Sequence, residues 1–234
     1  MKTLIINGSP RGLDSHTLRI ARAIAQGIGG ECSEFTAAEE KISPCTGCFS
    51  CWGKTAGRCV ITDGAQGLIE KIMESDFILE SYPLYFCSMP AQMKTVADRL
   101  LPLTLPFIGK SMPRGGEAFV RLRYEEELKK KKLVVVSTCG YGQTEGMFDA
   151  LRAQYDAVSG RDGYIPVFVP QGELYGFPSL EPQVQRRLGI AKMAGEELGA
   201  TGRISEATLG TLTSVLIPNR ALEKIALAGW GEKG

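Results

Sequence analysis

The sequence predicts an open parallel β-sheet of five strands with helices on both faces, followed by a C-terminal extension. Apolar runs of strand length alternate with segments whose apolar residues recur at helical spacing. Such strand–helix–strand repeats place successive strands parallel to one another in one sheet. The chain has 234 residues, which accommodates one sizeable domain over 1–200 and an extension over 201–234.

Each element is expected where the apolar pattern has the matching period. The strands are expected at 3–7, 32–36, 76–83, 132–140 and 164–170. The helices are expected at 16–28, 64–75, 90–101, 145–159 and 181–200, the second of them capped by Asp63. Two segments interrupt this order. The insert 102–131 is expected to form a surface loop with a small hairpin or helix, and 201–234 to pack on the domain or on a neighbouring subunit.

Composition excludes several classes of function. The net charge is +1, so no global field favours nucleic acid or a membrane surface. The lysine run 129–132 is interpreted as a solvated approach to a strand. No apolar stretch has bilayer length and the N-terminus lacks a signal-peptide pattern, so we expect a cytoplasmic protein. The only histidine is His16, which excludes a helical zinc motif with two histidines and disfavours hydrolase triads.

The segment "NGSPRGLDSHT" (7–17) connects the first expected strand to the first helix. Glycines allow the chain to turn there, and hydroxyl groups, one arginine and the free amides of a helix start can bind a dianionic phosphate. The residues concerned are Ser9, Arg11, Ser15 and Thr17. The G-x-x-x-x-G-K-[ST] and G-x-G-x-x-G patterns are absent, which disfavours the usual ATP, GTP and dinucleotide sites. An ordinary strand-to-helix turn is the alternative.

Two further loops follow expected strands at the same edge of the sheet. "SYPLYFCSMP" (81–90) carries Pro83, Tyr85 and Phe86, a rigid aromatic segment that can pack along a flat heterocycle. "STCGYGQTEG" (137–146) offers backbone amides beside Gly140 and Gly142. Ligands of open α/β sheets bind at the carboxyl ends of the strands. A phosphate loop, an aromatic wall and an amide-rich loop on successive strands predict an FMN site.

The segment "CTGCFSCWGKTAGRC" spaces four thiols as C-x2-C-x2-C-x7-C, at Cys45, Cys48, Cys51 and Cys59. The first three match the compact run that binds a 4Fe–4S cluster. Two alternatives remain open: a zinc ion held by four thiolates, or reduced thiols used in packing or at a subunit interface. Of the other cysteines, Cys32 is expected in the core. Cys87 and Cys139 are expected as packing or backbone positions.

Lys94 and Asp98 lie one helical turn apart, with Arg99 beside them. Oppositely charged side chains at this spacing meet on a helix surface, so an ion-pair network is expected. A role at a dimer interface is the second interpretation.

With these motifs in place, the chain resembles the flavodoxin-like NAD(P)H-dependent FMN reductase family, and especially its iron-sulfur flavoprotein branch. "GSPR…SHT" resembles the family's phosphate loop, with His16 where asparagine is usual. "SDFILESYPLYFCSMPAQMKTVADR" resembles its flavin loop and helix, and "CTGC…C…C…D" its cysteine-rich stretch. The resemblance covers roughly residues 1–170.

The resemblance implies a flavodoxin-like fold and a set of FMN contacts. The phosphate would be bound by Ser9, Arg11, Ser15 and Thr17, with His16 in the same loop. The isoalloxazine would be lined by Pro83, Leu84, Tyr85 and Phe86, with Thr138, Cys139 and Gly140 nearby. It also implies a homodimer or homotetramer with the flavin near the interface.

The function expected from the sequence is an FMN-dependent oxidoreductase that takes hydride from NADH or NADPH. No catalytic side chain is expected, because the flavin N5 atom accepts the hydride. Electrons would pass to a small-molecule or protein acceptor, directly or through a 4Fe–4S cluster, and neither nucleic acid nor a membrane is expected as a partner. Two alternatives are a flavodoxin-type electron carrier with poor NAD(P)H turnover, and a non-enzymatic α/β module stapled by zinc.

Overall fold

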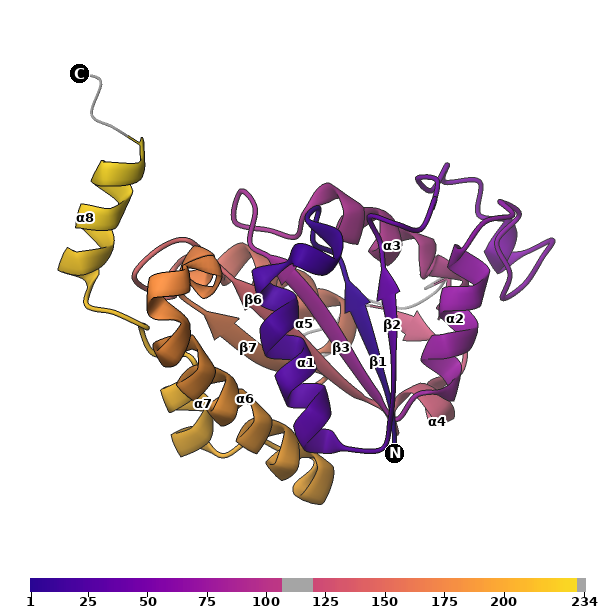
Figure 1. The fold of residues 1–234 in the computed structure, drawn as a ribbon. Helices are drawn as coiled ribbons and strands as arrows, with labels where there is room; N and C mark the ends of the chain where they lie inside the picture. The colour runs from indigo at the N-terminus through magenta and orange to yellow at the C-terminus, as the bar shows by residue number, and fades with distance from the viewer. Residues whose placement is uncertain (107–119, 231–234) are drawn as a thin grey trace.

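The computed structural model describes residues 1–106 and 120–230. Its centre is a five-stranded sheet in the order β2-β1-β3-β6-β7, in which all neighbouring strands are parallel (Figure 1). The strands are β1 (Lys2–Asn7), β2 (Glu31–Thr36), β3 (Phe77–Pro83), β6 (Lys132–Thr138) and β7 (Ile165–Val169). The predicted five-stranded parallel sheet is confirmed. Because β1, β3 and β6 are the three central strands, the loops that follow them meet at one edge.

Helices cover both faces of this sheet. One face carries α1 (His16–Ile28), α6 (Glu181–Thr201) and α7 (Glu206–Leu212), and the other carries α2 (Ala65–Glu74), α3 (Ala91–Arg99) and α5 (Asp149–Ser159). Successive strand residues point to opposite faces, so Ile5 joins the core beneath α1 and α6 while Ile6 joins the core beneath α2 and α3. Both cores lack solvent contact at their centres, which holds the central strands rigidly in place.

Most element boundaries agree with the apolar pattern, and two differ for local reasons. The helix α5 begins at Asp149 rather than 145, because a turn closed by the Met147 amide and the Thr144 carbonyl (3.1 Å) precedes it. The helix α2 begins at Ala65, whose amide donates to Asp63 Oδ1 (3.1 Å), although the capping position itself is Gly64. Asp63 therefore accepts a hydrogen bond from the first amide of α2, although it lies one residue before the N-cap position.

The insert contains both a small antiparallel strand pair and a short helix, the two kinds of element predicted for it. Its described part forms an antiparallel pair, β4 (Thr104–Leu105) with β5 (Arg121–Leu122), and a short helix α4 (Glu125–Leu128). Residues 107–119 of the insert lie outside the described residues. The lysine run is not wholly solvated, because Lys131 Nζ donates to the carbonyls of Met73 and Ser75, each at 2.7 Å.

The C-terminal extension is attached at the carboxyl edge of the sheet. Gln171 is buried, and its Oε1 accepts the amides of Leu216 (2.8 Å) and Ile217 (3.0 Å). The helix α7 packs on α6 and β7, whereas α8 (Asn219–Trp230) projects from the body (Figure 1). Packing of this extension on a neighbouring subunit stays a prediction.

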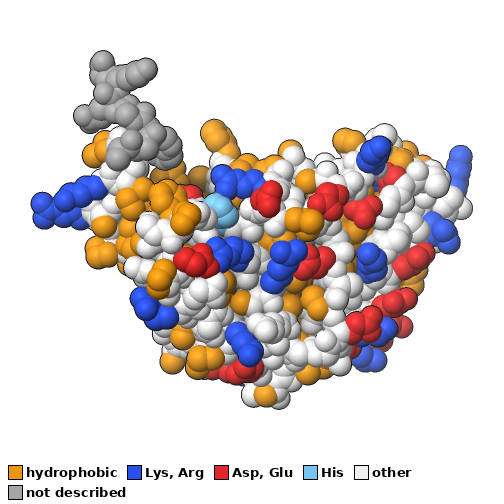
Figure 2. All heavy atoms as spheres, in the orientation of Figure 1, with side chains coloured by type: hydrophobic (Ala, Val, Ile, Leu, Met, Phe, Trp, Pro, Cys, Tyr) orange, Lys and Arg blue, Asp and Glu red, His pale blue; other side chains and the backbone are white. Residues whose placement is uncertain are grey.

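The prediction that Cys32 lies in the core is wrong. Cys32 is exposed, near the start of β2, because β2 is an edge strand with a neighbour on one side only. Charges of both signs are interspersed over the face seen in Figure 2, which agrees with the balanced composition. Among the described helices, none combines the length and apolarity that crossing a bilayer requires.

Candidate functional site

The loop between β1 and α1 is shaped by its own side chains. The Asn7 side chain accepts the Ser9 amide (3.2 Å) and donates to the Gly12 carbonyl (2.8 Å). Ser9 is buried, and its hydroxyl oxygen accepts the Arg11 amide (3.3 Å). A 3-10 turn, Gly12–Asp14, then leads to the helix. Most amides of this loop are therefore used internally, and an anion must rely on other donors.

Those donors lie at the start of α1. Ser15 is the N-cap, and its Oγ accepts the Leu18 amide (3.4 Å). The amides of His16 and Thr17 belong to the first turn and have no partner within the helix. Together with the Ser9 and Ser15 hydroxyl hydrogens and the exposed Arg11 guanidinium, they can donate to a doubly charged phosphate.

His16 lies beside Arg11 and against the segment after β7. Arg11 Nη1 is 3.2 Å from His16 Nε2, and a Cβ on Gly176 would lie 2.2 Å from the same nitrogen, so a side chain at Gly176 would require the imidazole to move. The single histidine is visible among Lys and Arg side chains in Figure 2. Burial and then the charge of Arg11 lower the pKa of His16. The neutral imidazole can accept a hydrogen bond from Arg11, which fixes the guanidinium near the loop.

Thr17 and Thr138 meet, although sequence reasoning assigned them to different parts of the ligand. Their hydroxyl oxygens are 2.6 Å apart, and both side chains are buried. The pair links the first turn of α1 to the end of β6. It therefore holds the loop between β1 and α1 and the loop after β6 at a fixed separation.

The loop after β3 forms a tight turn that projects from the carboxyl edge (Figure 1). Tyr85 and Ser88 exchange backbone hydrogen bonds of 2.9 and 3.0 Å, and the residues between them, Phe86 and Cys87, have φ values of 51° and 61°. Two positive φ angles are typical of a type I′ turn, which usually contains asparagine and glycine. Phe86 is 106% exposed and Tyr85 48% exposed. Strain of this kind collects at functional sites, and here it presents aromatic side chains to solvent.

The remaining predicted flavin contacts divide between the core and the surface. Leu84 packs partly against the core, and its amide donates to the Thr138 carbonyl (2.7 Å), which extends the contact between β3 and β6. Cys139 is buried, and burial raises the pKa of its thiol. Pro83 is half-buried and Gly140 is exposed at the edge. Cys139 is therefore a packing position in the core, as expected.

The four clustered cysteines line one pocket. Cys45 and Cys48 are exposed, Cys51 is buried and Cys59 is half-buried, around one open pocket that Asp98 and Arg99 also line. Hydrogen bonds from Ser50 lower the pKa of Cys48, whereas burial and the neighbouring Cys59 raise the pKa of Cys51. Within the described ranges, no group of three or more His, Cys, Asp or Glu side chains is close enough to hold a metal ion.

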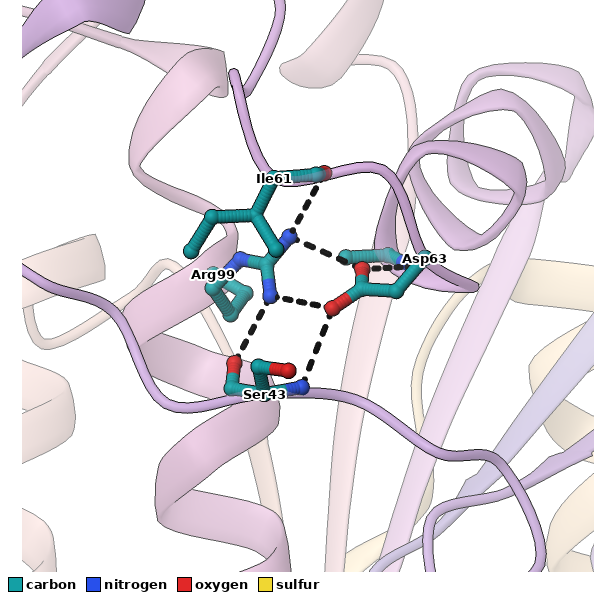
Figure 3. A network of polar contacts seen from close by, with 5 residues as sticks. Ser43, Ile61, Asp63 and Arg99 are labelled. Atoms are coloured by element: carbon teal, nitrogen blue, oxygen red, sulfur yellow. Dashed lines mark hydrogen bonds and ion pairs between the residues drawn. The ribbon is translucent and has the colours of Figure 1, made fainter.

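Arg99 makes a contact that sequence reasoning missed. Lys94 and Asp98 form the expected pair on the exposed face of α3, but Arg99 points away from them and pairs with Asp63 (Figure 3). The two residues are separated by 36 positions in the sequence, so helical spacing gives no indication of this pair. The only sequence feature that points to Asp63 is its place at the end of the "CTGC…C…C…D" motif, after Cys59.

The helix α3 connects the two candidate sites. Its first turn lies under the loop between β1 and α1, since a Cβ on Gly8 would be 2.5 Å from Met93 Cβ. Its last residue, Arg99, lines the cysteine pocket. With nine residues the helix is about 13 Å long. One rigid element thus determines the placement of both sites.

Solved structures define the class of fold. An FMN-dependent NADH-azoreductase from Bacillus anthracis, in complex with FMN, superposes with a TM-score of 0.56 at 14% identity, covering 85% of this chain and 100% of that one. An NAD(P)H:quinone oxidoreductase from Methanothermobacter marburgensis gives a TM-score of 0.57 at 15% identity, over 85% and 96% of the two chains. The fold is flavodoxin-like, as predicted.

The sequence profile of the NADPH-dependent FMN reductase family matches residues 1–161, so this chain belongs to that oxidoreductase family. An iron-sulfur flavoprotein from Methanocaldococcus jannaschii is 35% identical over 111 residues, which are 46% of this chain and 55% of that protein. One from Archaeoglobus fulgidus is 38% identical over 104 residues, 44% and 46% of the two chains. The chain therefore spans about half the length of the curated relatives it matches.

Proposed function

We propose that this protein is an FMN-dependent oxidoreductase that takes hydride from NADH or NADPH and passes electrons, through a 4Fe–4S cluster, to an acceptor. The observation that carries the proposal is the convergence of the two sites on α3. Membership of the NADPH-dependent FMN reductase family and similarity to proteins named iron-sulfur flavoproteins both support it.

The residues at the carboxyl edge fit FMN. The hydroxyl groups of Ser9 and Ser15, the first amides of α1 and Arg11 would bind its phosphate, with His16 holding Arg11. The strained turn would present Tyr85 and Phe86 along the ring, beside Pro83 and Leu84, with Thr138, Cys139 and Gly140 at its polar edge. When bound, FMN supplies the two-electron chemistry, and the protein binds and orients it.

The donor chemistry of the cysteine pocket suits a cluster of several metal atoms, although in this structure no three of its side chains lie close enough together to hold a metal ion. Four thiols from one short segment surround a single pocket, and one wall is the buried guanidinium of Arg99, whose Nε is without a hydrogen-bond partner among the described residues. A buried donor without an acceptor is costly and favours an anionic or sulfur acceptor in the pocket. Cys45, Cys48, Cys51 and Cys59 would each bind one iron of a 4Fe–4S cluster.

Three alternatives make different predictions for the same sample. Plain reduced thiols leave the purified protein yellow from FMN alone, and zinc adds a metal without colour. A flavodoxin-type carrier binds FMN but is reduced slowly by NAD(P)H. The acceptor proposed is a small molecule or a protein, and the protein is proposed to act in the cytoplasm as a homodimer or homotetramer.

Anaerobic purification followed by analysis of FMN, iron, acid-labile sulfide and zinc tests the proposal. We expect one FMN per chain and about four iron atoms with matching sulfide, as the cluster requires. Anaerobic addition of NADH or NADPH should reduce the flavin, and its absorbance band should disappear as soon as the reagents are mixed. A colourless protein that does not bind added FMN would contradict the whole proposal. A protein that contains FMN but no iron would contradict only the proposed 4Fe–4S cluster.

A further inference from the structure

Arg99 and Asp63 form a buried ion pair (Figure 3). Arg99 also lines the cysteine pocket. Arg99 Nη1 is 2.7 Å from Asp63 Oδ2, and Nη2 is 2.8 Å from Oδ1, so the two planar groups bond in parallel. The side chains are only 1% and 10% exposed. A bidentate, buried pair of this kind fixes the orientation of the guanidinium as well as its position.

The same guanidinium holds both ends of the cysteine segment. Nη1 donates to the carbonyl of Ser43 (2.7 Å), two residues before Cys45, and Nη2 donates to the carbonyl of Ile61 (3.3 Å), two residues after Cys59. Asp63 adds a bond from the Ser43 amide (3.0 Å). The loop that carries all four thiols is therefore closed at its base by one side chain from α3.

One donor of Arg99 is left over. The Nη1 and Nη2 groups bind Asp63 and the two carbonyls, whereas Nε is buried with no partner in the part of the chain described. Arg99 and Cys59 line the same pocket.

We propose that Arg99 is the positioning residue of the cysteine pocket: it closes the loop through its Nη groups and donates its Nε–H to the sulfur of Cys59 when the cluster is bound. This inference rests on the proposed function, because it requires the cluster. Reduction adds negative charge to a cluster, and hydrogen bonds to its sulfurs stabilise that charge. Arg99 therefore favours the reduced form and raises the potential at which the cluster accepts an electron.

The test is the variant Arg99→Lys, which keeps a positive charge but loses the fork and the Nε–H. Asp63→Asn separates the two roles, because it weakens the anchor while Arg99 keeps its Nε. The matched control is Arg22→Lys, since Arg22 makes an equally bidentate pair with Glu34 (2.7 and 2.8 Å) on the exposed side of α1. The measurements are FMN, iron and sulfide per chain, and the cluster potential from an EPR-monitored redox titration.

We expect Arg99→Lys to keep its FMN, to lose about tenfold in cluster affinity, as disturbed metal surroundings typically do, and to titrate at a more negative potential. Asp63→Asn should lose iron without a shift in the potential of the cluster that remains, and Arg22→Lys should match the wild type. A wild type with a full cluster and an Arg99→Lys variant with unchanged iron and potential overturn this inference alone. A flavin-containing wild type without iron overturns the proposed cluster, and this inference with it.

Pulsed EPR decides the matter if Arg99→Lys also loses FMN, which would indicate misfolding. The wild-type protein is labelled with 15N-arginine and its cluster reduced. Two other arginines lie near the cysteines: Arg58 precedes Cys59, and Arg123 donates to the Cys51 carbonyl (3.1 Å). An arginine nitrogen coupled to the cluster, and still present in Arg58→Lys and in Arg123→Lys, supports the Nε–H···S bond. The absence of that coupling overturns it.

Discussion

Thr17 and Thr138 share a hydrogen bond of 2.6 Å between two buried hydroxyl groups that are 121 residues apart in the sequence. The bond joins the helix that follows β1 to the end of β6. It links the loop between β1 and α1 directly, through side chains, to the loop that follows β6. Each buried hydroxyl needs a hydrogen-bond partner and finds it in the other, so the bond fixes the relative position of the two elements.

Thr17→Val or Thr138→Val should each lower the free energy of unfolding by about 1–3 kcal/mol, because each leaves a buried hydroxyl without a partner. The double variant Thr17→Val/Thr138→Val should cost less than the sum, since it removes both polar groups. Chemical denaturation of the three variants measures this. Strict additivity, or single variants as stable as the wild type, would show that the pair is not coupled.

Ser9→Ala combined with Arg11→Ala should weaken FMN binding by about a hundredfold, because two phosphate contacts of about 1.4 kcal/mol each are lost. Flavin fluorescence titration of the apoprotein gives the Kd. Arg161→Ala is the matched control, since Arg161 is 72% exposed and lies on the loop that enters β7, at the opposite end of the strand. Unchanged flavin affinity in the double variant removes the phosphate assignment.

Cys48→Ser should lower bound iron by about tenfold or more while FMN stays near one per chain, because one cluster ligand is replaced without disturbing the core. Cys48 is exposed, so the substitution has no packing cost. Cys32→Ser, at another exposed cysteine outside the pocket, should leave iron unchanged. Equal iron in the two variants would disprove a role for Cys48 as a ligand.

Glu80 should make stability decrease with pH. It lies on β3, receives a hydrogen bond from Tyr155, and burial raises its pKa from 4.5 to about 7. Between these values the folded protein binds the proton more strongly than the unfolded chain. The free energy of unfolding therefore falls as pH rises through this window, by roughly 3 kcal/mol in all.

Glu80→Gln removes this dependence, so the variant should be more stable than the wild type at pH 8 and similar to it at pH 4.5. Urea denaturation at both pH values measures the difference, and exposed Glu126→Gln serves as the control. A stability difference between Glu80→Gln and the wild type that does not change with pH would mean that Glu80 is ionised throughout.

The sheet could be predicted from the sequence because buried parallel strands are continuous apolar runs, as in "LVVVS" of β6. Cys32 was misplaced by the same rule, since an apolar run does not reveal that its strand lies at an edge. The Arg99–Asp63 pair and the Thr17–Thr138 bond join residues far apart in the chain, and no local period encodes them. The strained turn at Phe86 and Cys87 was also hidden, because neither residue type signals a positive φ.

The helix α3 carries Met93 beneath one site and Arg99 in the wall of the other, with no break between them. A single residue inserted between these two positions would rotate Arg99 by about 100° around the helix axis and withdraw it from Asp63. The length of α3 between Met93 and Arg99 is therefore constrained by the contacts at both of its ends. An insertion or deletion within α3 would therefore disturb both sites, whereas a substitution on its exposed side would leave Met93 and Arg99 in place.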